Sequence, residues 1–156
     1  MKIAMVRWLV AGGAWLAVAA FGAGVSASGG AVSVSDVKAE WKKKFGADKD
    51  KEWLKVSFTA TVVEKVDKFV YPKLKVSCGD AADEVTSMTT KFHELEVGKS
   101  AAHDAFVFFD KGEALATRPP SCTVKFGYGK STKKDDFTAI GDYCISGTSV
   151  SDGACK

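Results

Sequence analysis

Hydrophobic and polar positions alternate with a period of two over much of this chain. In the longest uninterrupted stretch, 54–62, five apolar residues alternate with Lys, Ser and Thr. The apolar residues are Leu54, Val56, Phe58, Ala60 and Val62. Because successive side chains of a β-strand point to opposite faces, this stretch predicts a strand with one buried and one solvated face. A similar alternation of Leu74, Val76 and Cys78 with polar residues predicts a second strand, beginning near Pro72.

Shorter alternations, separated by clusters of Gly, Pro, Asp or Lys, predict further strands. They cover 84–89, 92–97, 103–109, 122–128 and 137–146. Residues 37–45 fit either a strand or a short helix, and we favour the strand. In 105–109 both faces are apolar, which predicts a central strand covered on both sides; the alternative is an aromatic strip that recognises a partner. The expected fold is an all-β, immunoglobulin-like antiparallel β-sandwich of about seven strands over residues 36–156.

The first 27 residues have the pattern of a secretory signal peptide. Lys2 and Arg7 supply a positive region, 8–21 form an apolar stretch, and Val25-Ser26-Ala27 is a small-residue cleavage site. We predict cleavage after Ala27, which leaves no stable membrane anchor. The alternative is a retained membrane helix, because 8–25 lack charged residues. Residues 28–35 are predicted to be a loosely ordered, flexible lead-in, and the protein is expected to be secreted or periplasmic.

Cysteine usage supports the same compartment. The chain has four cysteines, all beyond the predicted signal: Cys78, Cys122, Cys144 and Cys155. Their even number predicts two disulfides, and we favour Cys78–Cys122 and Cys144–Cys155 among the three possible pairings. Because Cys78 and Cys122 both fall on inward-facing positions, their bond is expected to tie the two layers of the sandwich. That layout resembles an immunoglobulin-like sandwich, although no tryptophan lies between these two cysteines.

Charge and composition narrow the possible ligands. The formal charge of +3 falls to +1 without residues 1–27, which argues against nucleic acid as a partner. The run 42–44 of three lysines fits a solvated face. The cysteines lack the close spacing of a zinc site, so we predict no metal or other cofactor. Weak calcium binding by Asp135, Asp136 and Asp142 stays open.

No catalytic motif accompanies this pattern, so we predict a non-catalytic binding or envelope-associated module. Its expected partner is a protein or glycan outside the cytoplasm, and it is expected to be a monomer. One alternative is a small ribonuclease-like hydrolase that uses His93 and His103, helped by Glu94 and Arg118. Another is a secreted enzyme inhibitor with 111–120 or 144–155 as its reactive loop.

Overall fold

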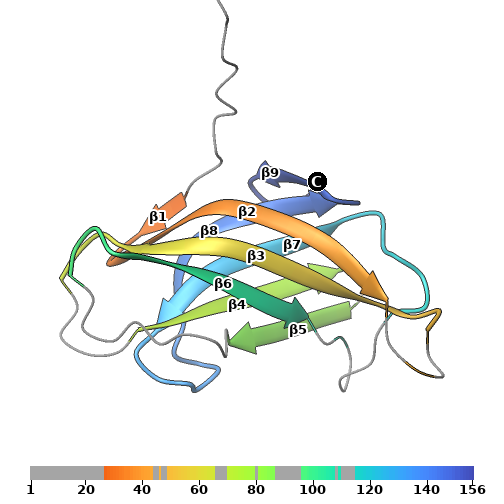
Figure 1. Cartoon of the computed structure of the whole chain (residues 1–156), viewed down its shortest axis with the longest axis horizontal. Coiled ribbons are helices and arrows are strands. Elements are labelled where there is room, and N and C mark those ends of the chain that lie inside the picture. Colours follow the sequence, from red (N-terminus) through yellow and green to blue (C-terminus); the bar gives the residue numbers. More distant parts are fainter. Residues whose placement is uncertain are drawn as a thin grey trace, which may run out of the picture.

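The computed structural model describes residues 27–43, 46, 49–65, 70–79, 81–86, 96–107, 109 and 115–156, with the backbone alone for 27–29 and 81–86. These residues form nine strands in two antiparallel sheets (Figure 1). The first sheet has the order β1-β2-β3-β6 and consists of β1 (Ala27–Gly29), β2 (Val32–Lys43), β3 (Glu52–Val62) and β6 (Ser100–Val107). The second has the order β5-β4-β7-β8-β9 and consists of β4 (Tyr71–Cys78), β5 (Ala81–Thr86), β7 (Cys122–Gly129), β8 (Thr138–Ser146) and β9 (Ser149–Asp152).

The predicted all-β architecture with two packed antiparallel sheets is therefore confirmed. Among the described residues there is no helix long and apolar enough to cross a membrane.

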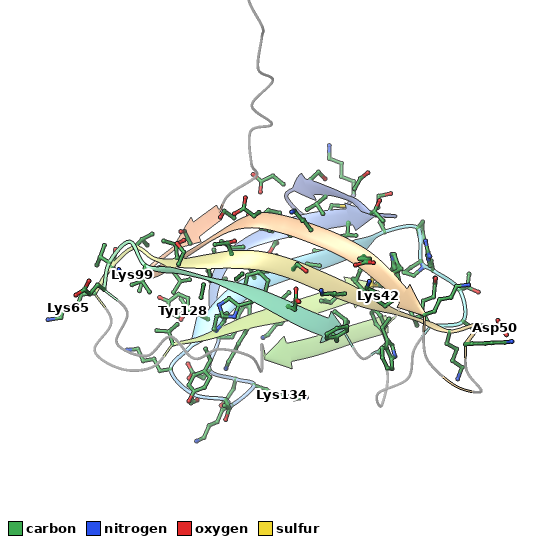
Figure 2. All side chains as sticks on the ribbon, viewed as in Figure 1. Lys42, Asp50, Lys65, Lys99, Tyr128 and Lys134 are labelled. Carbon is green, nitrogen blue, oxygen red and sulfur yellow. A yellow bond between two sulfur atoms is a disulfide. The ribbon has the colours of Figure 1, made fainter. Side chains whose placement is uncertain are left out.

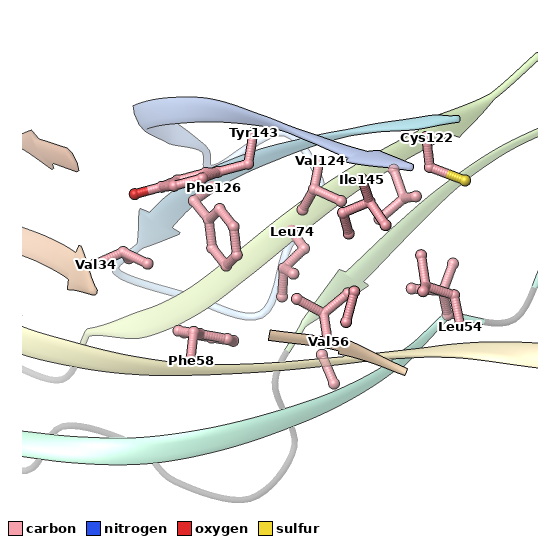
Figure 3. Packing of buried hydrophobic residues seen from close by; sticks show 14 of the residues in the cluster. Val34, Leu54, Val56, Phe58, Leu74, Cys122, Val124, Phe126, Tyr143 and Ile145 are labelled. Carbon is pink, nitrogen blue, oxygen red and sulfur yellow. The ribbon is translucent and has the colours of Figure 1, made fainter. Parts of the chain in front are cut away.

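The core lies between the sheets and is built from the alternating apolar positions. All five predicted inward residues of 54–62 are buried, as are the predicted inward residues of 74–78 and 122–126. Figure 3 shows Phe58 of the first sheet facing Phe126 and Tyr143 of the second. The rings of Phe58 and Phe126 are 5.0 Å apart edge to face, and those of Phe126 and Tyr143 are 5.2 Å apart. Such aromatic pairs add about 0.5–1.5 kcal/mol to the effect of burial alone.

Strand β2 corrects the prediction for residues 28–35. They are not a loose lead-in, because they pair in β1 and β2, and Val32 and Val34 are buried. The strand interpretation of 37–45 is confirmed for 37–43, and residues 44–45 lie outside the described part. Both segments belong to one strand that contains a β-bulge, in which Asp36 and Val37 lie opposite the single residue Phe58 of β3. The extra residue reverses the inward parity, from Val32 and Val34 before the bulge to Ala39 and Trp41 after it.

Three other predicted strands differ in part from the structure or lie partly outside the described residues. The strand predicted at 84–89 is β5, which ends at Thr86, and residues 87–89 lie outside the described part. Of the strand predicted at 92–97, the described residues 96–97 lie in and beside a turn. Strand β6 is not central: in the described part of the chain it ends the first sheet, with β3 beside it. Its Phe106 is 39% exposed, while Val107 and Phe109 are buried.

The cysteines pair as predicted, Cys78 with Cys122 and Cys144 with Cys155. The expected tie between the two layers is wrong, however. Cys78 ends β4 and Cys122 begins β7, and these strands are neighbours in the second sheet. The two Cα atoms are 4.2 Å apart, as suits residues directly opposite each other in an antiparallel pair. Inward parity places both thiols in the core, but it does not distinguish a neighbouring strand from a facing one.

The loop 130–137 covers the outer face of the second sheet. The fully buried Lys73 of β4 donates hydrogen bonds from Nζ to the carbonyl oxygens of Lys133 and Asp136. A Cβ on Gly129 would lie 2.2 Å from the Asp136 carbonyl oxygen, so this close approach needs glycine. Lys134, on the same loop, is labelled in Figure 2. The ammonium of Lys73 thus holds the loop against the sheet.

We predict that the two disulfides contribute unequally to stability. The sequence separations of 44 and 11 residues correspond to about 4 and about 3 kcal/mol in the chain-entropy model. Urea unfolding of Cys78→Ala/Cys122→Ala and of Cys144→Ala/Cys155→Ala measures both losses. A loss for the second pair equal to or above that for the first would contradict the prediction.

We also predict that Lys73→Met lowers the free energy of unfolding by about 2–4 kcal/mol, because two backbone carbonyl groups lose the charged, buried donor that holds them to the sheet. Hydrogen exchange of the amides in 130–137 should accelerate together with this loss. Lys75→Met is the matched control. Lys75 Nζ lies 4.3 Å above the Phe137 ring, a contact worth about 1 kcal/mol. Equal effects of the two variants would refute the role given to Lys73.

Candidate functional site

Of the residues proposed for a hydrolase, the two that the structure describes, His103 and Arg118, do not come together. His103 is 2% exposed in the core, and its ring stacks on Phe58 with the centroids 5.2 Å apart. Burial lowers the pKa of His103 below its usual value. Arg118 binds Glu52, which lies six residues from Phe58 on β3, or about 20 Å along the strand. His93 and Glu94 lie outside the described residues.

Arg118 instead fastens the loop before β7 to the first sheet. Its guanidinium donates to both carboxylate oxygens of Glu52, which lowers the pKa of that carboxyl. Leu115 and Glu52 also exchange two backbone hydrogen bonds of 2.8 and 2.9 Å. Residues 116–118 between these anchors are exposed. Of the loop proposed for an inhibitor, residues 111–114 lie outside the described part.

The three acids considered for calcium are not gathered into a site. Asp136 accepts hydrogen bonds from the backbone N–H and the hydroxyl of Ser131, at 2.6 and 2.7 Å, and its pKa is lowered mainly by the hydroxyl. A carboxylate oxygen of Asp142 lies 3.9 Å from Lys125 Nζ. The described residues contain no group of three or more His, Cys, Asp or Glu side chains arranged to hold a metal ion.

The outer face of the first sheet carries a depression at the β2 bulge, which we call the bulge site. The depression is open to solvent and has a volume of about 370 Å³. Its polar lining consists of Asp36 and Lys38 from β2, Ser57 and Thr59 from β3, and Asp104 from β6. Phe58, Ala102 and His103 complete the lining. This sheet lies in front of the other in Figure 1.

Strand register places the polar side chains of the bulge site in rows. Lys38 pairs with Ser57, and Ser57 pairs with Asp104, so these three residues form a row across β2, β3 and β6. Neighbouring strands are about 4.8 Å apart, so the row spans about 10 Å. The next row consists of Ser35, Thr59 and Ala102. The site therefore offers hydroxyl groups between a cation and a carboxylate.

Hydrogen bonds already organise one end of this row. The Ser57 hydroxyl donates to Asp104 Oδ1 at 2.6 Å, and Lys55 Nζ lies 2.9 Å from Asp104 Oδ2. These contacts, the Ser57 hydroxyl first, lower the pKa of Asp104 below its usual value. At the other end, Asp36 has a left-handed backbone with φ of 53°. It is the one non-glycine residue with positive φ in the described part of the chain.

The bulge site was not predicted from the sequence, because residues 28–35 were interpreted as a flexible lead-in. The sequence does contain a signal for the bulge: the apolar positions change from even numbers, Val32 and Val34, to odd numbers, Ala39 and Trp41. Such a change within one apolar alternation requires an extra residue, and Asp is among the few non-glycine residues that tolerate the left-handed conformation. Read this way, the sequence alone could have placed a bulge near Asp36.

We predict that the free energy of unfolding decreases as the pH is lowered below about 6.5, because the buried His103 must then be protonated when the chain unfolds. Since burial lowers its folded-state pKa below 6.5, the unfolded chain binds this proton first. The contribution is complete above pH 6.5 and declines as the pH falls toward the folded-state pKa, by up to about 1.4 kcal/mol per pH unit.

Urea unfolding of the native protein and of His103→Phe, which keeps a ring on Phe58, tests this between about pH 5 and 7.5. The lowered pKa values of Glu52, Asp104 and Asp136 affect stability below their usual values of 3.8–4.5, outside this window. Identical slopes for the two proteins would exclude His103 as the cause.

Comparison with known proteins gives no matching family model, no similar curated protein and no similar solved structure.

Proposed function

We propose that this protein is a non-catalytic binding module that acts outside the cytoplasm and holds a polar partner, a glycan or a polar protein segment, at the bulge site. The observation that carries the proposal is the row of Lys38, Ser57 and Asp104 beside the bulge. A small set of positioned polar groups in a concave surface is typical of ligand sites. The layout is immunoglobulin-like only in having two packed antiparallel sheets.

The chemistry of the site supports binding rather than catalysis. Ser57 is hydrogen-bonded to Asp104, but a carboxylate whose pKa is held low is a weak base toward a hydroxyl group. The neutral, buried His103 belongs to the core and stacks on Phe58. These features argue against a hydrolase that uses His103.

The disulfides support the proposed compartment. Two intramolecular disulfides fit an oxidising environment outside the cytoplasm. The signal-like pattern of residues 1–27 supports secretion or periplasmic residence. If cleavage follows Ala27, the new N-terminus is Ser28, which pairs with Ser33 in the first sheet.

The double variant Ser57→Ala/Asp104→Asn tests this function. Soluble envelope polysaccharides and envelope protein fragments are passed over the immobilised, oxidised protein, and binding is measured by interferometry. We expect the variant to bind at least about tenfold more weakly at an almost unchanged urea midpoint, because both side chains are exposed.

Lys125→Met is the matched control, because Lys125 is an exposed lysine on the outer face of the second sheet. It should bind like the native protein. Equal binding by the double variant, or an equal loss in Lys125→Met, would contradict the proposed site.

A further inference from the structure

We infer that the bulge site binds a saccharide that carries a carboxylate, such as a uronic acid residue. This inference rests on the proposed function and names its ligand class. Three features support it: the charged groups of Lys38 and Asp36, the hydroxyl groups of the neighbouring strand, and the backbone conformation of Asp36.

The free cation of the site is Lys38. Asp104, at the far end of the row, already binds Ser57 and Lys55. Among the described residues Lys38 has no ion-pair partner, and its side chain is exposed at the edge of the depression. An ammonium group without an ion-pair partner favours an anionic group on the ligand, and the Asp104 carboxylate opposes it little because Lys55 and Ser57 already bind that carboxylate.

The remaining polar groups suit hydroxyl groups on the same ligand. Among the described residues, the Asp36 carboxylate accepts one hydrogen bond, from the Ser35 hydroxyl at 3.1 Å. It can accept further hydrogen bonds from ligand hydroxyl groups, and Thr59 can both donate and accept. Lys38 and Lys55 balance Asp36 and Asp104, so the site is formally neutral. That balance disfavours a polyphosphate or a heavily sulfated chain and suits one carboxylate on a ring rich in hydroxyl groups.

The backbone of Asp36 is a second, independent observation. Glycine adopts a left-handed conformation freely, whereas residues with a side chain adopt it rarely and Asp is one of the few that tolerate it. The bulge therefore does not itself require a carboxylate at this position. Strained residues cluster at ligand sites, where the surrounding structure maintains them. Asp36 also lines the depression, which links this strain to the site.

The small volume and the open shape of the bulge site indicate a weak affinity. A volume of about 370 Å³ is near the lower end of small-molecule sites, and the site is open to solvent. It suits one or two sugar rings with one side in water. Binding of short oligosaccharides is therefore expected to be weak, near a Kd of about 1 mM for a few hydrogen bonds.

The test is a titration of the oxidised, ¹⁵N-labelled protein followed by amide chemical shifts. The probes are tri-galacturonate, its methyl ester and a hyaluronan tetrasaccharide, with inorganic sulfate as an anion without hydroxyl groups. We expect tri-galacturonate or the tetrasaccharide to shift the amides of 36–38, 57–59 and 102–104. The methyl ester and sulfate should bind at least about tenfold more weakly.

Three variants separate charge from fold. Lys38→Met should weaken binding about tenfold, whereas Lys38→Arg should bind within about threefold of the native protein. Asp36→Gly should weaken binding while the urea midpoint stays equal or rises, because glycine relieves the left-handed backbone.

Equal binding of the methyl ester, equal binding of sulfate, or an unchanged affinity in Lys38→Met would overturn the inference. So would the absence of shifts at the bulge site with both acidic probes. If the neutral ester or an envelope protein binds there instead, the ligand class is wrong and the binding module stands. If no partner in either experiment depends on the site, the proposed function falls as well.

Discussion

One extra residue in β2 determines which side chains this protein buries and which it presents. Without the bulge, the parity that buries Val32 and Val34 would turn Ala39 and Trp41 toward solvent. With it, the whole strand contributes to one core, and Trp41 donates from Nε1 to the Gly147 carbonyl oxygen at 3.1 Å. The same residue leaves Asp36 and Lys38 beside Ser57 on the outer face. Core formation and the candidate site thus depend on one local irregularity.

The two sheets are stabilised by different means. The first is held mainly by its regular ladder, with polar cross-strand pairs on its outer face, such as Thr61 with Ser100 at 2.7 Å. The second carries both disulfides and is covered by the 130–137 loop, with the ammonium of Lys73 beneath it. Tyr128 joins the sheets at one edge, since its hydroxyl accepts the Ala31 N–H at 3.2 Å (Figure 2). The first sheet, which carries the candidate site on its solvent-exposed face, therefore packs against a second sheet that contains both disulfides.

Period-two alternation predicted the inward faces of β3, β4 and β7, apart from Tyr128, which is only partly buried, because burial on one face produces a regular apolar alternation in the sequence. It did not predict which strands are neighbours. Cys78 and Cys122 have the parity expected of an inter-sheet bond, yet β4 and β7 lie side by side. Likewise, the apolar run 105–109 indicated a central strand, whereas β6 lies at the end of its described sheet with Phe106 partly exposed. The bulge site joins three strands, so it required both register and the parity change at Asp36.

The disulfide pairing also bears on the order in which the chain can assemble. Each bond joins cysteines that are consecutive in the sequence, Cys78 to Cys122 and Cys144 to Cys155. A chain that enters an oxidising compartment with its N-terminus first presents Cys78 and Cys122 together before either later thiol arrives. The first sheet is complete once residue 107 has emerged, while the second still lacks β7, β8 and β9. If the chain is exported as proposed, each cysteine therefore meets its native partner before the next thiol emerges, and oxidation in that order forms the native pairs directly.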